Sequence, residues 1–598
     1  MMKKRGKVYI GMATCGLAAG AKDVYDTFIS ELGKETKNIE IISTACIGMC
    51  SREVLVDVEL EGKARVTYEK VKPDMVRKII AEHIKENKPV KEWIFGQMEG
   101  KKGYPDINYY KDLPMFKHQV RVVLRNCGFI DPDKIDDYIK AGGYKALKKA
   151  LKMKPSEVID EIKKSGLRGR GGAGFPTGIK WELCSKSVSS QKYFICNADE
   201  GDPGAFMDRS TLEGDPHAVI EGMIIGGYAI GAGKGYIYCR AEYPLALKRL
   251  DKALAQAREK GFLGKKIFGG KFDFDIEVKE GAGAFVCGEE TALMASIEGE
   301  RGMPRPRPPY PAQSGLWGKP TNINNVETLA NVPFIINAGA EKFAALGTEK
   351  SKGTKVFAIT GKVKDSGLIE VPMGITINDM VYKAAGGMIS RKKFKGIQIG
   401  GPSGGCVPAS LGDTKVDYES LVSVGAIMGS GGAVVLDEGT CMVDMARFFL
   451  EFTANESCGK CSPCRLGIRQ LLHVINRICA GKGEISDKAN LVKMAETIKS
   501  CSLCGLGHTA PNPVMSTLRY FDKEYDEHIL EKKCKAGTCV DLLKFEVDES
   551  RCKKCGICVS ACTVNAIQGG AKSIANIIKE KCVKCRKCIE ACPFCAIY

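Results

Sequence analysis

The C-terminal part of the chain carries two runs of four cysteines with the spacing C-x2-C-x2-C-x3-C. In this spacing the first three cysteines of a run hold one [4Fe–4S] cluster, and the fourth reaches the other cluster. A zinc site needs four ligands and would leave the third and fourth cysteines of each run unused. The two predicted ligand sets are Cys552, Cys555, Cys558 and Cys592, and Cys582, Cys585, Cys588 and Cys562.

These runs resemble bacterial two-cluster ferredoxin domains, although Thr563 replaces the proline that usually follows the fourth cysteine. We therefore assign residues 546–598 to a ferredoxin domain with two [4Fe–4S] clusters. Such a domain implies that the chain transfers electrons.

The whole chain is long enough for several domains, since it has 598 residues of which 44% are hydrophobic. Its 27 cysteines lie in a large chain without a recognisable signal peptide, which favours metal ligands over disulfides. No apolar run reaches the roughly 18 residues of a membrane span. We expect an α/β multidomain protein in the cytoplasm of an anaerobic cell, with no transmembrane segment.

Residues 1–95 show the pattern of a small α/β domain. Apolar alternation predicts strands at 7–12, 39–43 and 53–58, and helical spacing predicts a helix at 23–32. Cys15 follows the strand predicted at 7–12, and Cys46 and Cys50 follow the strand predicted at 39–43.

This arrangement resembles the thioredoxin-like [2Fe–2S] domain of the small subunit that accompanies the complex I flavoprotein, and it implies a [2Fe–2S] cluster. Such domains normally supply a fourth cysteine shortly after the first, and residues 16–20 contain none. Either a non-cysteine ligand completes the cluster, or the three cysteines are buried thiols of a vestigial domain.

A glycine-rich segment, residues 166–180, follows a predicted helix at 155–165. Glycines at this density let backbone amides approach a phosphate. Gly169, Gly171 and Gly174 formally satisfy GxGxxG, but a dinucleotide βαβ unit requires a strand before the motif. The segment alone therefore does not identify the ligand.

Three more motifs follow in order, at 197–204, 281–293 and 321–328. With the glycine segment they closely resemble the NADH-binding flavoprotein subunit of complex I and its relatives in soluble hydrogenases and formate dehydrogenases, over residues 110 to 510. The resemblance implies a Rossmann-like FMN and NAD(P)H domain at 110–345. It places in the flavin pocket Gly169, Arg170, Gly171, Lys180, Asn197, Asp199, Gly288, Glu289, Asn324, Asn325 and Thr328.

The same resemblance implies NAD(H) or NADP(H) as the substrate. Phe175 and Tyr310 would stack on the dinucleotide, the alternative being ordinary core packing, and Glu200 would face the nucleotide. Arg307 stands where complex I proteins usually carry lysine, and Gly201 replaces a usually larger residue. These two departures leave the choice between NAD and NADP open.

Two further domains follow the flavin domain. Residues 355–436 alternate apolar and polar residues between glycine turns and resemble the soluble-ligand-binding β-grasp domain of the same subunit. Residues 440–525 have the spacing of a helical bundle that begins with CxxCxxC. The family pattern implies a third [4Fe–4S] cluster on Cys458, Cys461, Cys464 and Cys504. Cys501 is the alternative to Cys504 as the fourth ligand.

Residues 526–545 contain His528, Cys534 and Cys539, a set that the simple complex I subunit lacks. Structural zinc is bound tetrahedrally by cysteine and histidine together. We infer a Zn²⁺ site with Cys441 as the fourth ligand, which would fix the ferredoxin domain against the flavin core. The alternative is that Cys534 and Cys539 are free thiols near a domain boundary.

The formal net charge of +18 does not indicate a nucleic-acid partner. Each [4Fe–4S] cluster with its thiolates carries about −2, so three clusters and a flavin phosphate would cancel about eight positive charges. The lysines are scattered rather than interleaved with aromatic residues, so a solvated surface explains them better.

The order of these domains resembles the β-subunit of multimeric NAD(P)-linked [FeFe] hydrogenases, including electron-bifurcating ones. The resemblance implies an oxidoreductase subunit that exchanges hydride between NAD(P)(H) and FMN and passes single electrons through its clusters. The implied partners are an [FeFe] hydrogenase catalytic subunit, a small thioredoxin-like [2Fe–2S] subunit and ferredoxin. The alternatives are the NADH-binding subunit of a formate dehydrogenase and, less favoured, an electron-carrying scaffold with an inactive flavin site.

Overall fold

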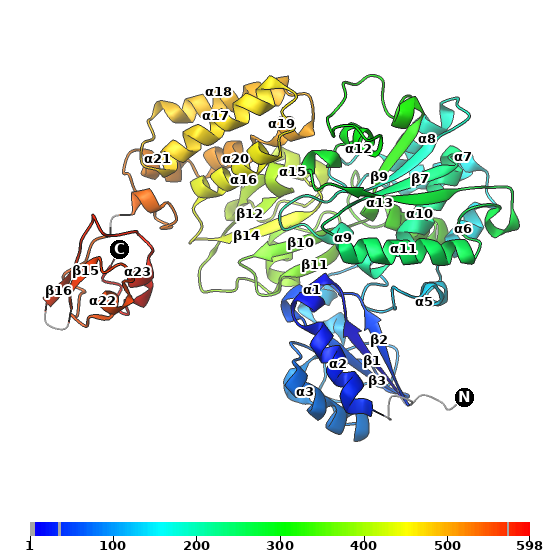
Figure 1. The fold of residues 1–598 in the computed structure, drawn as a ribbon, viewed down its shortest axis with the longest axis horizontal. Helices are drawn as coiled ribbons and strands as arrows, with labels where there is room; N and C mark the ends of the chain where they lie inside the picture. Colours follow the sequence, from blue (N-terminus) through cyan, green and yellow to red (C-terminus); the bar gives the residue numbers. More distant parts are fainter. Residues whose placement is uncertain (1–5, 34–37, 544, 571–572, 598) are drawn as a thin grey trace.

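The computed structural model of the protein describes residues 6–33, 38–543, 545–570 and 573–597. Within these residues, four β-sheets and a helical bundle make up the chain (Figure 1). This mixed α/β architecture agrees with the class predicted from the sequence. In the same residues no helix combines the length and the apolar character that crossing a membrane requires.

The first sheet lies at the N-terminus and has five strands in the order β2-β1-β3-β4-β5. Its strands are β1 (Gly6–Gly11), β2 (Ile39–Thr44), β3 (Val56–Leu60), β4 (Val66–Tyr68) and β5 (Ile94–Gln97). Its helices are α1 (Thr14–Ala18), α2 (Ala21–Leu32) and α3 (Pro73–Lys78). β1 and β2 are parallel, and the other neighbours are antiparallel. The helix predicted at 23–32 is confirmed, because α2 buries one apolar side against the sheet.

The strand predicted at 53–58 begins later, at Val56. Glu53 accepts a hydrogen bond on Oε2 from the Leu55 amide at 3.0 Å, so the backbone of 53–55 turns instead of joining the ladder. Apolar alternation could not reveal this side-chain contact.

The second sheet has four parallel strands in the order β8-β7-β6-β9. They are β6 (Tyr193–Ala198), β7 (Lys234–Arg240), β8 (Asp275–Gly281) and β9 (Thr321–Asn325). From β6 the chain moves through β7 to β8 and then returns to the other side of β6. The strand order therefore reverses between β6 and β9, and the carboxyl ends of strands at such a point form a crevice for ligands.

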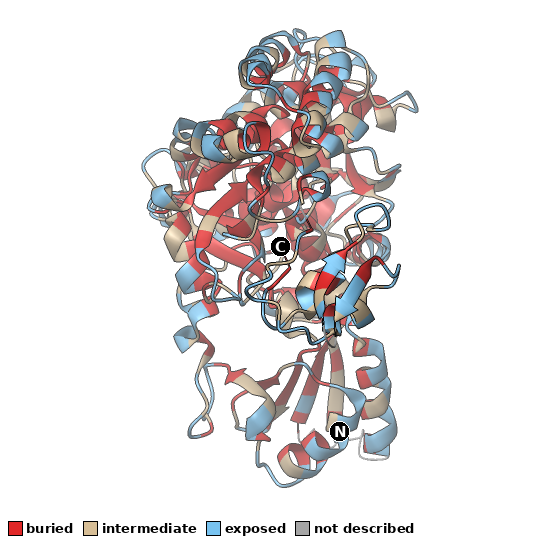
Figure 2. Ribbon diagram, turned by 90° about the vertical axis from the view of Figure 1, so that its left-hand side faces the viewer, coloured by how far each residue is buried: buried red, intermediate tan, exposed pale blue. Residues whose placement is uncertain are grey.

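Helices cover this parallel sheet and bury its apolar strands. They are α5 (Ile135–Lys140), α6 (Lys145–Ala150), α7 (Pro155–Ser165), α8 (Thr177–Lys186), α9 (Met207–Gly214), α10 (Pro216–Ile230), α11 (Pro244–Glu259), α12 (Glu290–Ile297), α13 (Val326–Ala338) and α14 (Ala340–Ala344). Helix α4 (Pro114–Lys117) instead packs into the separate core of the third sheet. Across the chain, strands are mostly buried, while helices at the surface also carry exposed residues (Figure 2). The helix predicted at 155–165 is α7. A Cβ on Gly222 of α10 would lie 2.2 Å from the Leu329 carbonyl oxygen of α13. Any side chain at position 222 would therefore collide with the backbone of α13.

The third sheet has five strands in the order β11-β10-β14-β12-β13. Its elements are β10 (Thr354–Gly361), β11 (Gly367–Pro372), β12 (Phe394–Ile399), β13 (Gly405–Pro408), β14 (Gly432–Asp437) and helix α15 (Tyr418–Ser423). β10 and β14 are parallel, and the remaining pairs are antiparallel. The glycine-bounded alternation predicted between 355 and 436 thus corresponds to a sheet.

A helical bundle and a small fourth sheet complete the chain (Figure 1). The bundle contains α16 (Met442–Glu456), α17 (Ser462–Cys479), α18 (Ser486–Cys501), α19 (Gly505–Thr509), α20 (Asn512–Tyr520) and α21 (Asp522–Ile529). The C-terminal unit contains α22 (Ile557–Ala561), β15 (Ile567–Gly570), β16 (Ser573–Ile577) and α23 (Lys587–Ala591). Lys584 Nζ of this unit donates to the Val540 and Asp541 carbonyls at 3.1 and 3.3 Å, which connects it to the segment after the bundle.

A buried ion pair joins the second unit to the third sheet. Lys355 of β10 pairs with Glu327 of α13, and their side chains are only 0% and 1% exposed. Lys355 Nζ also donates to the Val356 carbonyl at 2.7 Å, and the Val356 amide donates to Glu327 Oε1 at 2.9 Å. The pair therefore fixes the first turn of α13, at the edge where the strand order reverses.

Removing the Lys355 charge should destabilise the protein strongly. Lys355→Met leaves the Glu327 carboxylate buried without its cation, and breaking such a pair costs about 3–5 kcal/mol. Urea unfolding of the full chain, followed by tryptophan fluorescence, should show a lower midpoint. Lys362→Met, which alters an exposed lysine just after the same strand, is the matched control. Equal losses in the two variants would contradict this role for Lys355.

Candidate functional site

The reversal point between β6 and β9 collects the polar residues of two predicted motifs. Asn197 is the penultimate residue of β6. Its Nδ2 donates to the Gly288 carbonyl at 2.9 Å, and its Oδ1 accepts from the Asp199 amide at 3.0 Å. Asn325 ends β9, and its Nδ2 donates to Asp208 Oδ2 at 2.5 Å. The parallel topology thus brings motifs that are far apart in the sequence to one sheet edge.

The glycine segment forms a hairpin-like loop that leads into α8. The Gly169 amide donates to the Phe175 carbonyl at 2.8 Å, and the Thr177 amide donates to the Leu167 carbonyl at 2.9 Å. Tyr418 of the third unit donates to the Gly169 carbonyl at 2.6 Å. A Cβ on Gly174, whose φ is +65°, would lie 2.5 Å from the Tyr418 ring. Glycine at 174 therefore allows the loop to rest on this tyrosine, a contact that the sequence did not reveal.

Arg170 anchors this loop to its surroundings. Its amide donates to Thr328 Oγ1 at 2.8 Å. Its guanidinium is buried and donates to the Thr354, Arg168 and Lys352 carbonyls at 3.0, 2.8 and 2.6 Å. The Arg170 side chain, which the resemblance places in the flavin pocket, is therefore engaged with backbone carbonyls of the protein.

Other residues assigned to the pocket by resemblance cap helices or bond to neighbours. Glu200 Oε1 and Oε2 accept from the Asp208 and Arg209 amides at 3.2 Å each, at the start of α9. Glu289 accepts from two amides at the start of α12, and Asn325 does the same for α13. Asn324 Oδ1 accepts from Trp181 Nε1 at 2.8 Å. These contacts fix the backbone of the pocket, and charge-assisted caps of this kind are among the stronger hydrogen bonds.

Asp199 is a buried carboxylate whose two oxygens lack a hydrogen-bond partner. Burial raises the pKa of Asp199 to about 7. Thr177 Oγ1 and Asp208 Oδ1 are also buried without a partner, and neither residue was predicted from the sequence. Buried unpaired groups are costly, so a ligand that donates hydrogen bonds fits this edge. The N–H and hydroxyl groups of a flavin mononucleotide meet that requirement.

Glu290, a residue of the 281–293 motif that was assigned no role from the sequence, links two predicted cations. Glu290 accepts from Lys180 at 3.1 Å and from Arg307 at 2.7 Å. Burial would raise the pKa of Glu290, but the two cations outweigh it and hold the pKa below its ordinary value. Phe175 and Tyr310 are 50% and 55% exposed, so neither is a core residue, and both remain available to a ligand.

The cysteines of the bundle surround one small cavity. It is lined by Cys458, Cys461, Cys464 and Cys504, together with Val286 and Pro304 of the second unit. Cys501 is exposed and does not line it. Lys460 Nζ donates to the Pro304 carbonyl at 2.6 Å, and the Phe285 amide donates to Glu456 Oε2 at 3.0 Å. A cluster on these thiols would therefore lie against the motif at 281–293 of the flavin unit.

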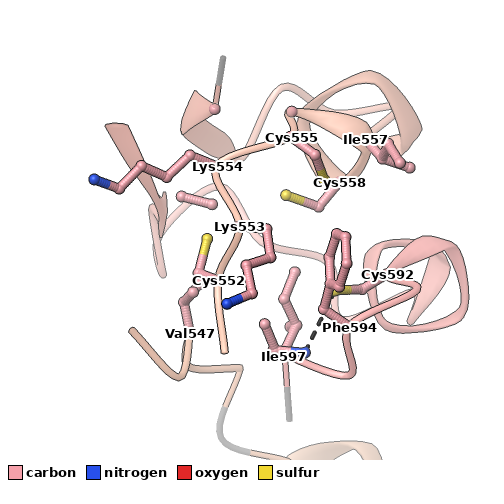
Figure 3. A pocket seen from close by; sticks show the side chains of 14 residues that line it. Val547, Cys552, Lys553, Lys554, Cys555, Ile557, Cys558, Cys592, Phe594 and Ile597 are labelled. Atoms are coloured by element: carbon pink, nitrogen blue, oxygen red, sulfur yellow. Dashed lines mark hydrogen bonds between the residues drawn. The ribbon is translucent and has the colours of Figure 1, made fainter. Parts of the chain in front are cut away.

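The C-terminal cysteines form two separate sets. Cys552, Cys555, Cys558 and Cys592 line one cavity, and Figure 3 shows all four around it. Cys562, Cys582, Cys585 and Cys588 line a second cavity. Each set combines three cysteines of one run with the last cysteine of the other, as the spacing predicted. Four thiols around a small apolar cavity fit a [4Fe–4S] cluster.

The three N-terminal cysteines also lie together. The Sγ atoms of Cys15 and Cys50 are 3.6 Å apart. Hydrogen bonds with Cys15 and Cys50, burial, and the charges of Cys50 and Glu53 all raise the pKa of the Cys46 thiol, so these groups form one cluster. Thr14, next to Cys15, donates through its amide and its hydroxyl to Glu213 of α9 at 2.9 and 2.5 Å. This links the cysteines to the flavin unit.

The fourth metal-ligand set joins the bundle to the segment that follows it. The ligand atoms of Cys441, His528, Cys534 and Cys539 all lie within 4.8 Å of one another, and all four residues are buried. His528 Nδ1 bonds to the Glu524 carbonyl at 2.7 Å, which leaves Nε2 toward the thiols, 3.3 Å from Cys539 Sγ and 3.4 Å from Cys441 Sγ. This donor set fits tetrahedral zinc, including the backbone contact that orients the histidine. Cys479 forms an overlapping group of possible ligands with Asp444 and Cys539.

This combination defines an oxidoreductase subunit with an FMN-binding domain and iron–sulfur domains. Residues 162–334 match the Nuo51 FMN-binding domain, 444–528 match the NADH-ubiquinone oxidoreductase-F iron–sulfur binding region, and 545–568 match a 4Fe-4S binding domain. The chain belongs to the family of NADH-binding flavoprotein subunits that complex I shares with NAD(P)-linked hydrogenases.

The similar proteins include members from both kinds of complex. The NADP-reducing hydrogenase subunit HndC of Solidesulfovibrio fructosivorans is 57% identical over 76% of this chain and 93% of its own length. The second F-type subunit of the NADH-quinone oxidoreductase of Rhizobium meliloti is 44% identical over 69% of this chain and 98% of its own. An NAD⁺-reducing [NiFe]-hydrogenase structure aligns with a TM-score of 0.62 and 29% identity, over 88% of this chain and 84% of that chain.

The bundle cavity distinguishes Cys504 from Cys501 as a ligand. Cys504→Ala should remove one cluster, about four iron atoms per chain, whereas Cys501→Ala should leave the iron content unchanged. Iron analysis and electron paramagnetic resonance of the anaerobically isolated full chain measure this. Iron loss in the Cys501 variant alone would assign the ligand to Cys501.

Proposed function

We propose that the chain is the diaphorase subunit of a multisubunit hydrogenase of the cytoplasm. It would exchange hydride between NAD(P)(H) and FMN, and exchange single electrons with an [FeFe] hydrogenase subunit, with ferredoxin-linked electron bifurcation. When bound, FMN takes up or gives off hydride as an electron pair and exchanges electrons one at a time with iron–sulfur clusters. The observation that carries the proposal is the cavity of four cysteines whose wall includes Val286 and Pro304 of the flavin unit.

The residues of the sheet edge would hold the two nucleotides. Asp199 and Thr177 supply buried acceptors for the flavin, and the loop anchored by Arg170 supplies backbone amides. The exposed rings of Phe175 and Tyr310 would stack on the dinucleotide. Lys180 and Arg307, which share Glu290, place positive charge at this edge, where anionic phosphates are favoured.

The remaining sites would continue the electron path. We propose that the domain predicted at 1–95 is thioredoxin-like and carries a [2Fe–2S] cluster on Cys15, Cys46 and Cys50, and that the domain predicted at 355–436 is a β-grasp domain. The two C-terminal cysteine sets would carry [4Fe–4S] clusters that exchange electrons with ferredoxin. A small thioredoxin-like [2Fe–2S] subunit would be a further partner.

The direct test is anaerobic purification of the native complex, identification of its subunits by mass spectrometry, and assay of hydrogen-dependent NAD⁺ and NADP⁺ reduction with and without ferredoxin. We expect an [FeFe] hydrogenase subunit and reduction that depends on ferredoxin. A molybdenum- or tungsten-containing formate dehydrogenase subunit in its place would retain the diaphorase role and overturn the hydrogenase assignment.

The zinc proposal has a separate test. The set of Cys441, His528, Cys534 and Cys539 would hold the segment whose carbonyls at Val540 and Asp541 accept from Lys584 of the ferredoxin domain. His528→Ala should remove about one zinc ion per chain and speed limited proteolysis between 530 and 545. His473→Ala, which changes a histidine of the same bundle that lies outside this set, should do neither. Full zinc content in the His528 variant would refute the site.

A further inference from the structure

A carboxylate lies among the three N-terminal cysteines, where the expected fourth cysteine is missing. Glu53 follows the short helical turn of Cys50–Arg52, and its Oε2 faces the loop that carries Cys15. A Cβ added to Gly11 or Gly16, on either side of that loop, would lie 3.2 or 3.3 Å from Glu53 Oε2. The carboxylate therefore occupies the space that a side chain from the Cys15 loop would otherwise fill.

The two oxygens of Glu53 have different surroundings. Oε2 accepts from the Leu55 amide at 3.0 Å, which orients the carboxylate. Oε1 is buried and has no hydrogen-bond partner. A buried carboxylate oxygen without a donor is costly, and coordination of a metal is one way in which proteins compensate such a group. Glu53 thus combines an anchored oxygen with one that is free for a ligand.

Contacts with the rest of the chain hold the surrounding loops in place. The Leu368 amide donates to the Gly48 carbonyl at 2.8 Å, between Cys46 and Cys50. Arg52, next to Glu53, donates to Asp365 Oδ1 and Glu69 Oε2 at 2.6 Å each. The loops that carry the cysteines and the carboxylate are therefore fixed against both the first sheet and the third.

We propose that Glu53 is the fourth ligand of a [2Fe–2S] cluster whose other ligands are Cys15, Cys46 and Cys50. This inference rests on the proposal above that these cysteines hold such a cluster. An ionised carboxylate carries one negative charge, as a thiolate does, so the oxidised cluster keeps the net charge of about −2 that four thiolates would give it. Carboxylate oxygen is a harder ligand than thiolate sulfur, so the cluster should differ spectroscopically from an all-cysteine one.

A second unpartnered oxygen nearby provides the sharpest comparison. Ser51 Oγ is also buried without a partner. Carboxylates are established oxygen ligands of iron in proteins, whereas a neutral hydroxyl must first lose a proton to become an anionic ligand. Glu53 is therefore the better ligand, and Ser51→Ala should leave the cluster intact.

The test uses the full chain, isolated anaerobically, with iron analysis, visible absorption and electron paramagnetic resonance after reduction. The spectra are recorded at temperatures where the faster-relaxing [4Fe–4S] signals have broadened away. We expect the wild-type chain to show a two-iron signal that Glu53→Gln loses. Glu53→Cys should keep the signal with shifted g-values and stronger visible absorption, because a thiolate replaces an oxygen. Ser51→Ala and Glu92→Gln, an exposed glutamate of the same domain, should match the wild type.

The outcomes separate the two proposals. A two-iron signal that is identical in wild type and Glu53→Gln would overturn the role of Glu53 and leave the cluster assignment standing. The absence of such a signal from the wild type would overturn both. Loss of the signal in Glu53→Cys as well as Glu53→Gln would show that the carboxylate supports the fold and does not bind iron, since cysteine replaces glutamate as a ligand but not as a hydrogen-bond acceptor.

Discussion

The arrangement of the flavin edge depends on the buried guanidinium of Arg170. It has no carboxylate partner among the described residues and instead binds the carbonyls of Thr354, Lys352 and Arg168. A buried charge is tolerated when its donors are satisfied, so these carbonyls and the guanidinium hold one another in place. The glycine loop is thereby fixed to the third sheet, and the Arg170 amide ties it to the first turn of α13.

The cysteine sets lie on two sides of this edge, one toward the bundle and one toward the N-terminal sheet. The bundle cavity touches the 281–293 motif, and the zinc-type set connects the bundle to the ferredoxin unit. On another side, α9 bears Asp208, which contacts Asn325, and Glu213, which binds Thr14 beside Cys15. One short helix therefore contacts both the flavin edge and the loop that carries Cys15. The cysteine sets therefore lie on two sides of the edge that carries the flavin-binding motifs.

The sequence was most informative where ligands are close together along the chain. The exchange of the fourth cysteine between the C-terminal runs follows from local spacing, and the structure shows the same two sets. The four residues of the zinc-type set were also predicted from the sequence, because cysteine and histidine are rare and are common zinc ligands. The structural class, the helices at 155–165 and 23–32 and the sheet within 355–436 followed from periodicity and turn residues.

The sequence could not predict contacts that arise only when distant segments meet. Glu290 lies in a recognised motif, but its contacts with Lys180 and Arg307 come from segments far away in the sequence. Tyr418, which supports the glycine loop, lies in a segment with no distinctive spacing. The side chains of Glu200 and Glu289 cap helices, and that of Arg170 donates to carbonyls. Resemblance to a family does not show which of these polar groups already form hydrogen bonds within the protein. Alternation of Val54, Val56 and Val58 predicted that Glu53 is part of a strand. This pattern carries no information about the hydrogen bond that Glu53 accepts from the Leu55 amide.

The most direct test of the central claim is titration of the isolated, anaerobic full chain with NADH and with NADPH, in the absence of any partner protein, followed by visible absorption and electron paramagnetic resonance. The account predicts that reduced iron–sulfur signals appear together with bleaching of the flavin, and that Cys458→Ala uncouples them by keeping the bleaching while most cluster reduction is lost. Flavin bleaching without cluster reduction in the wild type, or cluster reduction that is unchanged in Cys458→Ala, would contradict the claim that this chain turns hydride into single electrons through the bundle cluster.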